Sequence, residues 1–409
     1  MSVLTKKDSF NETKLGYIPS EWEIKRIRSF AKVITGSTPS TSDLSNYGNE
    51  YKFVSPADLG GNKFISKTKK MLSRKGFESS RKMPKNSILF TCIGSTIGKI
   101  GLCKENVTSN QQINAILPNN TYISDFIYYE LQRLAPKIKS LANEQAIPMI
   151  NKSDFEYFQV IFPPLEEQKK IAQILSQWDE AIETTQNLIE KLQFRKKGIM
   201  QALLSGKKRL AGFSEEWKEE QLGNFIKYTP RPKDKPKNNY LALGLRSHGK
   251  GIFHKENFDP NSIAMDTLYE VKENDLVVNI TFAWEHAIAV ANNVDEGGLV
   301  SHRFPTYTFI ENQSDSIFFR YYVLQKRFKY LLNVISPGGA GRNRVMSKKD
   351  FPKLIVNVPP FNEQVAISKV LSSVDNEIEI LLERLKAQKK QKKGLMQQLL
   401  TGKKRVKLN

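Results

Sequence analysis

The stretch from Pro163 to Leu210 returns in closely similar form at Pro359 to Val406, and this repeat constrains the fold more than any other feature. The two copies align without a gap at an offset of about 196, with roughly 21 of 48 positions identical. Each copy begins with Pro-Pro, continues through Glu-Gln and ends on Gly-Lys-Lys-Arg. A segment that recurs with matched ends predicts the same structural element twice in one chain.

Within each copy the apolar residues recur in alternating steps of four and three, the seven-residue period of a coiled-coil seam. A helix of about 40 residues would be roughly 60 Å long. The leading prolines suit its first turn, and Gly206 and Gly402 suit its end. Lys196 and Lys392 fall on the same seam. Two such helices most simply pack on each other, with two unrelated surface helices as the alternative. The predicted helix-pair seam comprises Ile171, Leu175, Trp178, Ile182, Ile189, Ile199, Leu203, Ile367, Leu371, Val374, Ile378, Leu381, Leu385, Leu395 and Leu399.

The residues before each helix form two blocks that resemble each other more loosely. Trp22 and Trp217 stand near the starts of the blocks, and the Tyr-Tyr pair that begins at Tyr128 aligns with the pair that begins at Tyr321. The offsets between these landmarks differ by a few residues, so the scaffold repeats while its loops change in length. Diverged loops on a shared scaffold are typical of a duplicated binding module.

Short β-rich runs separated by turn residues predict a small mixed sheet in each block. A helix follows in both. Its apolar face runs from Ile127 to Leu141 in the first block, where Pro136 should bend it, and from Ile317 to Ile335 in the second. The expected strands cover residues 51–54, 87–93 and 112–117 in the first block, and residues 240–245, 275–280 and 306–310 in the second.

The net charge of +21 on 409 residues indicates a polyanionic partner. Nucleic acid is the commonest such partner, and a membrane surface is the rival. No apolar run reaches spanning length, no lipidation motif appears, and the polar first residues are not a signal peptide, so no membrane partner is expected. Cys92 and Cys103 are the only cysteines, which predicts a reduced, cytoplasmic protein without a disulfide framework.

The duplicated Pro-Pro…Glu-Gln…Gly-Lys-Lys-Arg helices, Gly94 to Gly101 and Asn110-Gln111-Gln112 together resemble the specificity subunit of a type I restriction–modification enzyme. The resemblance covers essentially the whole chain. It implies an α+β fold with two similar target-recognition domains, each a small mixed sheet plus helices. Two long helices would separate them and form an antiparallel coiled coil, with pseudo-two-fold symmetry. The implied domains are residues 1–162 and 209–358 for recognition, with a central spacer helix at 163–208 and a C-terminal spacer helix with a basic tail at 359–409.

The same resemblance implies that each recognition domain reads one half of an asymmetric, bipartite site in double-stranded DNA. Related domains on opposed helices could address opposite strands about one turn (~34 Å) apart. The helices would set the gap and dock two modification subunits, which would carry S-adenosylmethionine and methylate adenine. Restriction subunits would join through that complex. The chain itself would hold no cofactor and catalyse nothing.

Motifs that could indicate catalysis have simpler interpretations. Gly94 to Gly101 has three residues between its first two glycines where a nucleotide-binding loop has four, so a turn near DNA phosphate or a plain β-turn fits better. Val358 interrupts the Asn-Pro-Pro-Phe signature of amino-methyltransferases at Asn357. The Glu-x-Lys triplets at Glu23 and Glu50 arise easily by chance in so charged a chain. The four histidines lack metal-ligand spacing, so no metal is expected.

Contacts with DNA are expected from polar residues of the variable loops, because Gln and Asn bind an adenine edge bidentately and Arg reads guanine. Basic residues that alternate with prolines after Thr229 suit an extended loop that follows phosphates. Each of these residues has a solvated loop position as its alternative. The predicted DNA-binding residues are Ser37, Thr38, Thr91, Ser95, Thr96, Lys99, Gln111, Gln112, Asn143, Gln145, Arg231, Lys233, Lys235, Arg246, His248, Asn279, Trp284, His302, Arg303, Arg342, Asn343 and Arg344.

Two functions of other classes compete with DNA recognition. A self-contained methyltransferase or nuclease would need catalytic and cofactor motifs that this sequence lacks. A coiled-coil nucleic-acid-binding scaffold or assembly protein without sequence specificity would explain the helices and the charge. It would not explain why two similar blocks carry different loops.

Overall fold

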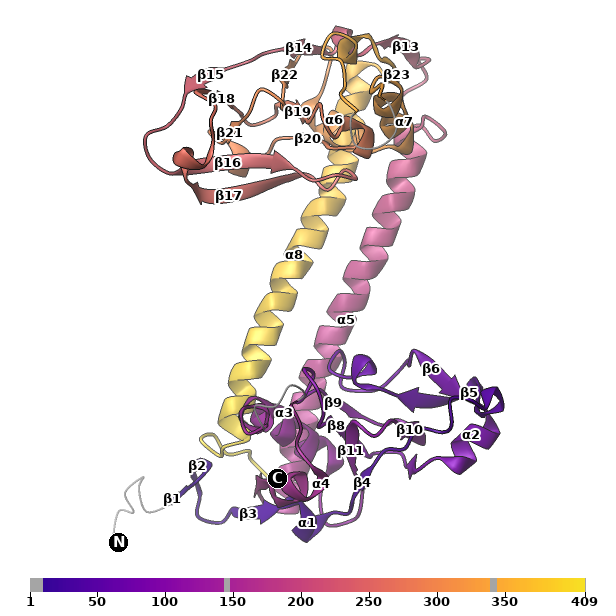
Figure 1. Cartoon of the computed structure of the whole chain (residues 1–409), viewed down its shortest axis with the longest axis vertical. Coiled ribbons are helices and arrows are strands. Elements are labelled where there is room, and N and C mark those ends of the chain that lie inside the picture. The colour runs from indigo at the N-terminus through magenta and orange to yellow at the C-terminus, as the bar shows by residue number, and fades with distance from the viewer. Residues whose placement is uncertain (1–9, 143–147, 339–343, 409) are drawn as a thin grey trace. The chain divides into compact units, whose positions relative to one another are not determined.

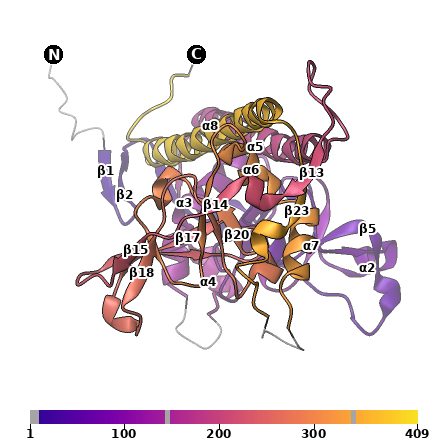
Figure 2. The ribbon, with the colours of Figure 1, turned by 90° about the horizontal axis from the view of Figure 1, so that it is seen from above.

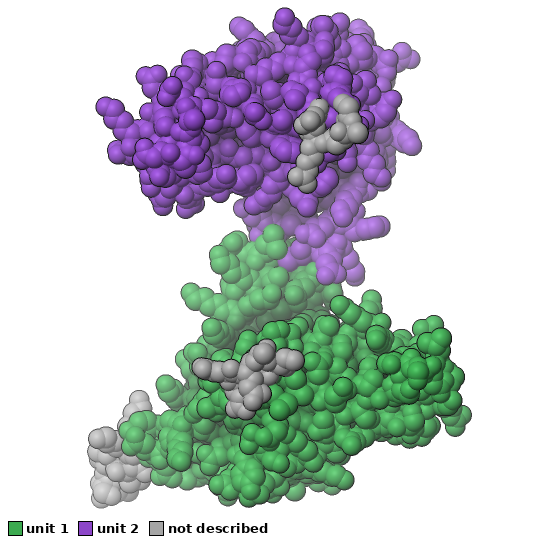
Figure 3. Space-filling model, in the orientation of Figure 1, with its two compact units in different colours: residues 1–188, 381–409 green, residues 189–380 purple. Residues whose placement is uncertain are grey.

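The computed structural model describes residues 10–142, 148–338 and 344–408. It divides into two units, residues 1–188 with 381–409 and residues 189–380, which Figure 3 shows in different colours. Each unit combines one globular domain with part of helix α5 (Leu165–Leu204) and part of helix α8 (Phe361–Leu399). We call the globular parts domain 1 (residues 10–162) and domain 2 (residues 213–358).

Domain 1 contains, within its described residues, a hairpin and three small sheets, and its helices lie against them (Figure 1). The sheet orders are β1-β2, β6-β5-β10-β7, β4-β11-β8-β9 and β12-β3. The strands are β1 Phe10–Thr13, β2 Gly16–Pro19, β3 Glu23–Arg26, β4 Val33–Thr35, β5 Tyr47–Val54, β6 Lys70–Leu72, β7 Lys82–Met83, β8 Ile88–Thr91, β9 Ile100–Leu102, β10 Val107–Ser109, β11 Ile113–Ile116 and β12 Gln159–Phe162. The helices are α1 Ile27–Phe30, α2 Arg74–Ser79, α3 Ser124–Ser140, which continues through Pro136, and α4 Lys152–Tyr157.

Domain 2 lies to one side of the helix segments of its own unit (Figure 2). Its sheet orders are β13-β23, β14-β22-β19-β20 and β15-β18-β21-β16-β17. The strands are β13 Lys218–Gln221, β14 Ile226–Tyr228, β15 Pro232–Asp234, β16 Tyr240–Leu245, β17 Ile252–Phe258, β18 Thr267–Glu270, β19 Leu276–Val278, β20 Ile288–Val290, β21 Leu299–Val300, β22 Thr306–Phe309 and β23 Ile355–Val358. The helices are α6 Ser316–Tyr322 and α7 Lys326–Val334.

The sheets of domain 2 repeat those of domain 1 strand for strand. The order β4-β11-β8-β9 corresponds to β14-β22-β19-β20, and β3-β12 corresponds to β13-β23. The order β6-β5-β10-β7 corresponds to β17-β16-β21-β18, and in both sheets the central pair, β5 with β10 and β16 with β21, is parallel. Among the described residues, domain 2 adds the edge strand β15, and domain 1 adds the β1-β2 hairpin and α2. The short helices α1 and α4 of domain 1 are replaced in domain 2 by 3-10 turns at Leu222–Asn224 and Phe351–Lys353. The chain is therefore an α+β protein with one scaffold built twice.

Each domain shares its hydrophobic core with the helix segments of its own unit. In the first unit Phe155 and Ile127 belong to the same buried cluster as Leu175 of α5 and Leu399 of α8. In the second unit Phe319, Phe351 and Val356 cluster with Leu203 of α5 and Leu371 of α8. Fully burying one such side chain contributes roughly 1.5–3 kcal/mol, so the helices are part of the folded domains.

The two long helices run in opposite directions within each unit. In the first unit Lys392, near the end of α8, donates to Asp179, near the start of α5, at 2.5 Å. In the second unit Lys196, near the end of α5, donates to Asp375, near the start of α8. The predicted seam residues are all buried or half-buried, and Leu175 is 0 % exposed. In the described part of the chain no helix carries an apolar stretch long enough to cross a membrane.

The prediction of one continuous helix from Ile317 to Ile335 is wrong, because α6 and α7 are separated by residues 323–325. The carbonyl of Val323 accepts a hydrogen bond from Nε2 of the buried His286 at 2.6 Å. This hydrogen bond ties the residues between α6 and α7 to a histidine that is distant in sequence.

The tyrosine alignment was also wrong, by one position. The Tyr129 hydroxyl donates to Asp179 at 2.5 Å, and the Tyr321 hydroxyl donates to Asp375 at 2.6 Å. Tyr129, rather than Tyr128, is thus the structural equivalent of Tyr321. The error arose because consecutive tyrosines offer two alignments in sequence and only the contact with the long helix distinguishes them.

Candidate nucleic-acid interface

The β4-β11-β8-β9 sheet brings three loops of domain 1 to one edge. Strand β11 is antiparallel to both β4 and β8, with Thr35 opposite Asn114. Thr91 lies opposite Ile113, and β9 pairs with β8 from the same end. The ends of β4 and β8 and the beginnings of β11 and β9 therefore coincide. We call the resulting surface edge 1, which comprises the loops 36–46, 92–99 and 110–112.

Hydrogen bonds and one close backbone approach hold the loops of edge 1 together. The Thr38 hydroxyl donates to Gln111 Oε1 at 2.7 Å, and the Ser37 hydroxyl accepts from the Arg81 amide at 2.9 Å. A Cβ at Gly36 would lie 2.2 Å from the Asn110 carbonyl oxygen, so only glycine allows the two loops to meet there. Polar side chains that lie far apart in sequence, from residue 37 to residue 112, are thereby gathered at one surface.

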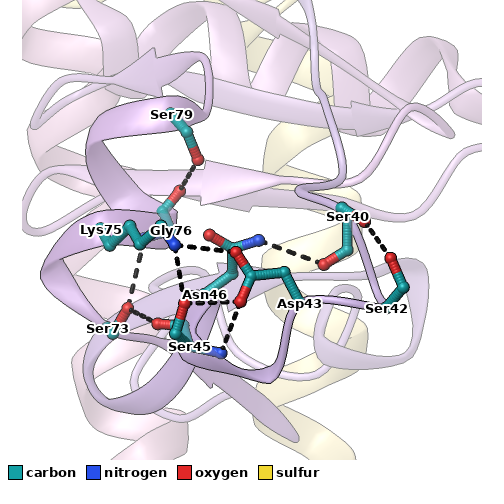
Figure 4. Close-up of polar contacts among 9 residues, drawn as sticks. All are labelled: Ser40, Ser42, Asp43, Ser45, Asn46, Ser73, Lys75, Gly76 and Ser79. Atoms are coloured by element: carbon teal, nitrogen blue, oxygen red, sulfur yellow. Dashed lines mark hydrogen bonds and ion pairs between the residues drawn. The ribbon is translucent and has the colours of Figure 1, made fainter.

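A polar cluster fixes the far end of loop 36–46, as the labelled side chains of Figure 4 show. The Ser73 hydroxyl donates to the Ser45 carbonyl at 2.6 Å, and Lys75 forms a 2.8 Å ion pair with Asp43. Hydrogen bonds from Lys75 and Ser45 lower the pKa of the Asp43 carboxyl to about 2. A Cβ at Gly76 would lie 2.0 Å from the Asn46 carbonyl oxygen, so the loop and helix α2 touch directly. The loop is thus held at both ends before any ligand binds.

The glycine-rich segment is a turn between β8 and β9. Gly94 and Gly98 have positive φ angles of 90° and 93°, which favour glycine. The Gly98 amide donates to the Thr91 carbonyl at 3.1 Å, so the turn closes the β8-β9 hairpin. Ser95 is exposed at its tip, and Lys99 lies half-buried over Gly60. This geometry is that of a β-turn that presents polar groups, and it does not support a nucleotide-binding loop.

The corresponding sheet of domain 2 builds an equivalent edge. Tyr307, near the start of β22, lies opposite both Tyr228 and Leu276, and Val278 at the end of β19 lies opposite Ile288 at the start of β20. By the same register argument the loops that follow β14 and β19 meet the loops that precede β22 and β20. We call this surface edge 2, which comprises the loops 229–231, 279–287 and 301–305.

Two further segments of domain 2 join edge 2. The backbone amide of His248 donates to the Glu285 carbonyl at 2.7 Å, which places the 246–250 turn against loop 279–287. The Arg344 guanidinium lies 5.4 Å from the Trp284 ring centroid. Lys348 Nζ donates to the His302 carbonyl at 2.8 Å, and burial lowers the pKa of Lys348. Edge 2 and its joined segments thus expose Arg246, His248, His302 and Arg303, whereas the exposed predicted residues of edge 1 are Thr38, Ser95 and Gln111.

The buried His286 connects edge 2 to the end of α6. Its side chain is 5 % exposed, and this burial lowers the pKa of the ring. The nearby Lys329 and His248 lower the pKa further, whereas the hydrogen bond to the Val323 carbonyl raises it. The neutral ring therefore donates to Val323 and couples loop 279–287 to the end of α6. His254 forms a 2.7 Å hydrogen bond with Asp295.

Three predicted DNA-binding residues are buried or half-buried and bonded within the domain or enclosed by it. Thr91 is 0 % exposed, and Asn279 is 7 % exposed with its Oδ1 accepting from the amide and the hydroxyl of Thr281. Arg231 donates two hydrogen bonds to Asp275, which is 1 % exposed. Burial raises the pKa of the Asp275 carboxyl, and the bonds from Arg231 oppose this rise. Thr91 and Asn279 thus lie inside the domain, and the half-buried Arg231 is paired with Asp275.

The basic segment after Thr229 is also corrected. The predicted extended loop is partly the edge strand β15, antiparallel to β18. Lys233 lies 3.6 Å from Glu270 and is exposed, whereas the half-buried Lys235 donates to the Ile263 carbonyl at 2.7 Å. Lys237, which follows β15, is also exposed. Four predicted DNA-binding residues, Asn143, Gln145, Arg342 and Asn343, lie outside the described residues.

The remaining predicted residues reach the surface to different degrees. Those that are exposed are Thr38, Ser95, Gln111, Lys233, Arg246, His248, His302 and Arg303, and those that are half-buried are Ser37, Thr96, Lys99, Gln112, Lys235, Trp284 and Arg344. All but Lys233 and Lys235 lie at edge 1 or edge 2 or on the segments that join edge 2.

Sequence reasoning missed Arg81 and Lys348, which border the two edges. Arg81 is exposed and donates to the Thr35 carbonyl at 3.0 Å beside edge 1. Lys348 begins a Lys-Lys-Asp-Phe stretch that matches Lys-Ser-Asp-Phe at Lys152, and this match is the sequence signal that could have identified it.

The described residues hold no group of three or more His, Cys, Asp or Glu side chains able to bind a metal ion. Cys92 and Cys103 are buried, and burial raises the pKa of Cys92 to about 12, so its thiol stays protonated. Asn357 of the Asn-x-Pro-Pro sequence lies on β23, where its amide donates to the Tyr322 hydroxyl at 3.1 Å. These environments are structural.

Comparison with known proteins points to one family. A family model described as Type I restriction modification DNA specificity domain matches residues 19–193 and again residues 214–390. The specificity subunit of the type I restriction enzyme MjaVIII of Methanocaldococcus jannaschii is 27% identical, with 98% of this chain and 97% of the relative covered. The HindI specificity subunit of Haemophilus influenzae is 31% identical over 38% of this chain and 36% of its own.

Solved structures agree on the fold. The type I restriction–modification S subunit from M. genitalium superposes with a TM-score of 0.58, at 17% identity, over 95% of this chain and 97% of that one. A likeness at this level of identity concerns the backbone architecture alone.

Proposed function

The chain belongs to the family of type I restriction–modification DNA specificity subunits, and from this premise we propose that each domain reads one half of an asymmetric, bipartite DNA site. The observation that carries the proposal is the repeated scaffold with unlike edges. The same strand order gathers loops at the same edge in both domains, while the side chains there differ in kind. A duplicated scaffold with diverged loops suits two different base sequences.

The chemistry of the edges suggests how each half is read. Edge 1 offers the Thr38 and Ser95 hydroxyls and the Gln111 and Gln112 amides, and a glutamine can bind an adenine edge bidentately. Edge 2 offers Arg246 and other cationic groups that suit guanine. We therefore expect an adenine-containing contact for domain 1 and a guanine-containing contact for domain 2. The net charge of +21 supplies attraction to the phosphates of either half.

The long helices are proposed to set the gap as a coiled-coil spacer and to dock two modification subunits. Beside their buried seam they expose large apolar side chains: Phe194 is 80 % exposed and Ile380 is 68 % exposed. We propose that the modification subunits cover these side chains when they dock. Adenine methylation, with S-adenosylmethionine, would take place on the modification subunits, and restriction subunits would join the complex through them.

The helix docking proposal can be tested directly. Phe194→Ser is expected to weaken co-purification with the modification subunit, while Gln193→Ser, a neighbouring exposed position, leaves it unchanged. Equal co-purification of both variants would contradict docking at this surface.

The reading function is tested by selection from a random-sequence duplex library, using the chain in complex with its modification subunits. We expect methylation at two short motifs separated by a fixed gap. Uniform, sequence-independent binding would instead support a nucleic-acid-binding scaffold, and methylation by the chain alone would support a self-contained enzyme. Deleting one heptad from each helix removes about 10 Å, so the selected gap is expected to shorten by about three base pairs.

A further inference from the structure

One carboxylate in the first unit joins three parts of the fold. Asp179 of α5 accepts from Lys392 of α8 at 2.5 Å and from the Tyr129 hydroxyl of domain 1 at 2.5 Å. Ser176, one turn earlier on α5, lies 3.3 Å from the same hydroxyl. The Lys392 ammonium lies 5.0 Å from the Tyr129 ring centroid. Helix, opposing helix and domain therefore meet at this point.

The second unit builds the same junction from equivalent residues. Asp375 of α8 accepts from Lys196 of α5 and, at 2.6 Å, from the Tyr321 hydroxyl of domain 2. Ser372 lies 3.4 Å from that hydroxyl, and the Lys196 ammonium lies 5.1 Å from the Tyr321 ring centroid. The roles of the helices are exchanged, because α8 now supplies the aspartate and α5 the lysine.

The lysines occupy seam positions, where a polar residue fixes the register of paired helices. Lys392 is 9 % exposed, so a shift of one helix along the other would leave its buried charge without Asp179. An unpaired buried charge is strongly unfavourable. The aspartate that satisfies the lysine thus also selects the helix register.

The tyrosines couple the domain to that register. Tyr129 is 0 % exposed, and Tyr321 is 6 % exposed. Burial, reinforced by the adjacent carboxylate, raises the pKa of Tyr321 to about 12 and raises that of Tyr129 as well. Both hydroxyls are therefore permanent donors, and each seats its domain on the carboxylate that fixes the helix pair.

We propose that the Tyr129–Asp179–Lys392 and Tyr321–Asp375–Lys196 junctions are positioning elements that determine how strictly the protein measures the gap between half-sites. This inference rests on the proposed function. Helix length sets the coarse spacing, and the junctions hold each domain at one place on its helix. A loosened junction would let the domain meet its half-site at neighbouring gaps, without altering the bases that its edge reads.

The two junctions differ in one respect that yields a directional expectation. Lys63 of domain 1 donates to Ser176 at 2.8 Å, forms an ion pair with Asp125 and is 6 % exposed. It supplies a second tie between domain 1 and α5. Among the described contacts of Ser372 in the second unit, no lysine takes that place. Loss of the tyrosine hydroxyl should therefore relax the second junction more than the first.

The test uses the full chain in complex with its modification subunits. The selected site is placed in duplexes whose gap is the native length or one or two base pairs shorter or longer, and methylation rates are measured for the wild type, Tyr129→Phe and Tyr321→Phe. Tyr128→Phe and Tyr322→Phe are the matched controls. Tyr128 makes no side-chain hydrogen bond among the described contacts, and Tyr322 bonds only within domain 2, to the Asn357 backbone at 3.0 Å.

We expect the preference of the wild type for the native gap over its neighbours to fall about tenfold in Tyr321→Phe, the loss of one hydrogen bond to a charged group. A smaller fall is expected in Tyr129→Phe. The controls should keep the wild-type gap profile, even if Tyr322→Phe lowers stability. The bases required at each half-site should stay the same in all variants.

The outcomes separate the inference from its premise. A wild type that selects no two-part site would defeat the proposed function. A wild type that selects one, with a gap profile unchanged in both junction variants, would defeat the positioning role. As a readout that needs no DNA, spin labels at Lys85→Cys in domain 1 and Gln173→Cys on α5 should give a broader distance distribution when Tyr129→Phe is added. An unaltered distribution would also count against the inference.

Discussion

The buried carboxylate of Glu167, at the start of α5, allows a quantitative test of how the segment after α8 is joined to α5 and to Trp22 of domain 1. Glu167 is 2 % exposed and accepts two hydrogen bonds from Arg405, from Nε at 2.9 Å and from a terminal nitrogen at 2.6 Å. The Trp22 indole N–H adds a third at 3.3 Å. Removing Arg405 would leave this carboxylate inside the fold with only the tryptophan donor.

The magnitude follows from burial and exposure. Removing one partner of a fully buried ion pair costs about 3–5 kcal/mol. The Arg405 side chain is 40 % exposed, so water can replace part of the guanidinium, and we expect Arg405→Ala to cost about 2–3 kcal/mol. In Arg405→Ala/Glu167→Gln the charge is gone while an acceptor remains for Trp22. That double variant is expected to recover at least about 1 kcal/mol.

The assay is urea unfolding followed by tryptophan fluorescence, with hydrogen exchange to assign the loss to the first unit. Lys403→Ala is the matched control, because it removes an exposed charge two residues away. The second unit offers an internal repeat of the experiment: Arg209 forms the same two bonds to Glu363, both at 2.6 Å. If Arg405→Ala and the double variant were equally stable, the reasoning about a stranded charge would be refuted.

Three further predictions concern other parts of the chain. Burial lowers the pKa of His286 below its value in the unfolded chain, so the folded state binds a proton on this ring less readily. The free energy of unfolding is therefore expected to fall as the pH drops below about 6.5, by at most about 1.4 kcal/mol per pH unit. Urea midpoints at pH 7.5 and 5.5 should differ less in His286→Gln than in the wild type. Leu175→Ala is expected to cost about 2–5 kcal/mol in the same unfolding assay, because the side chain is 0 % exposed, while Ile380→Ala at a 68 % exposed position should be nearly neutral. Arg303→Ala should relax base preference in one half-site only, by about 1–3 kcal/mol, and relaxation of both half-sites would contradict separate reading. Lys233→Ala should reduce the salt dependence of binding without changing the selected sequence.

Much of the architecture followed from periodicity and repetition. The seven-residue period located α5 and α8 to within a few residues of their ends, because a seam must be apolar wherever two helices meet. The β-rich runs located β5, β8, β11, β16, β19 and β22, because strands buried in a small sheet must be short and apolar. The break between α6 and α7 was not predicted, because the apolar spacing from Ile317 to Ile335 continues through it.

The candidate site was predictable in kind but less so in detail. Loop polarity identified Thr38, Gln111, Arg246 and Arg303 as surface residues near sheet ends. The same polarity selected Thr91, which the fold buries completely. Residue type alone cannot distinguish a polar side chain that faces solvent from one that is buried beneath a loop.

By itself the sequence determined that one scaffold occurs twice, that two long helices with matching seams accompany it, and that the protein meets a polyanion. These properties follow from the spacing of apolar residues, from the internal repeat and from the net charge, all of which can be read without a three-dimensional structure. Only the tertiary structure decided which polar loops share an edge, that Arg231 is paired with the buried Asp275, and that Asp179 and Asp375 join each domain to its helix segments. Each of these depends on strand register and on contacts between distant residues, and such contacts arise only once the chain has folded.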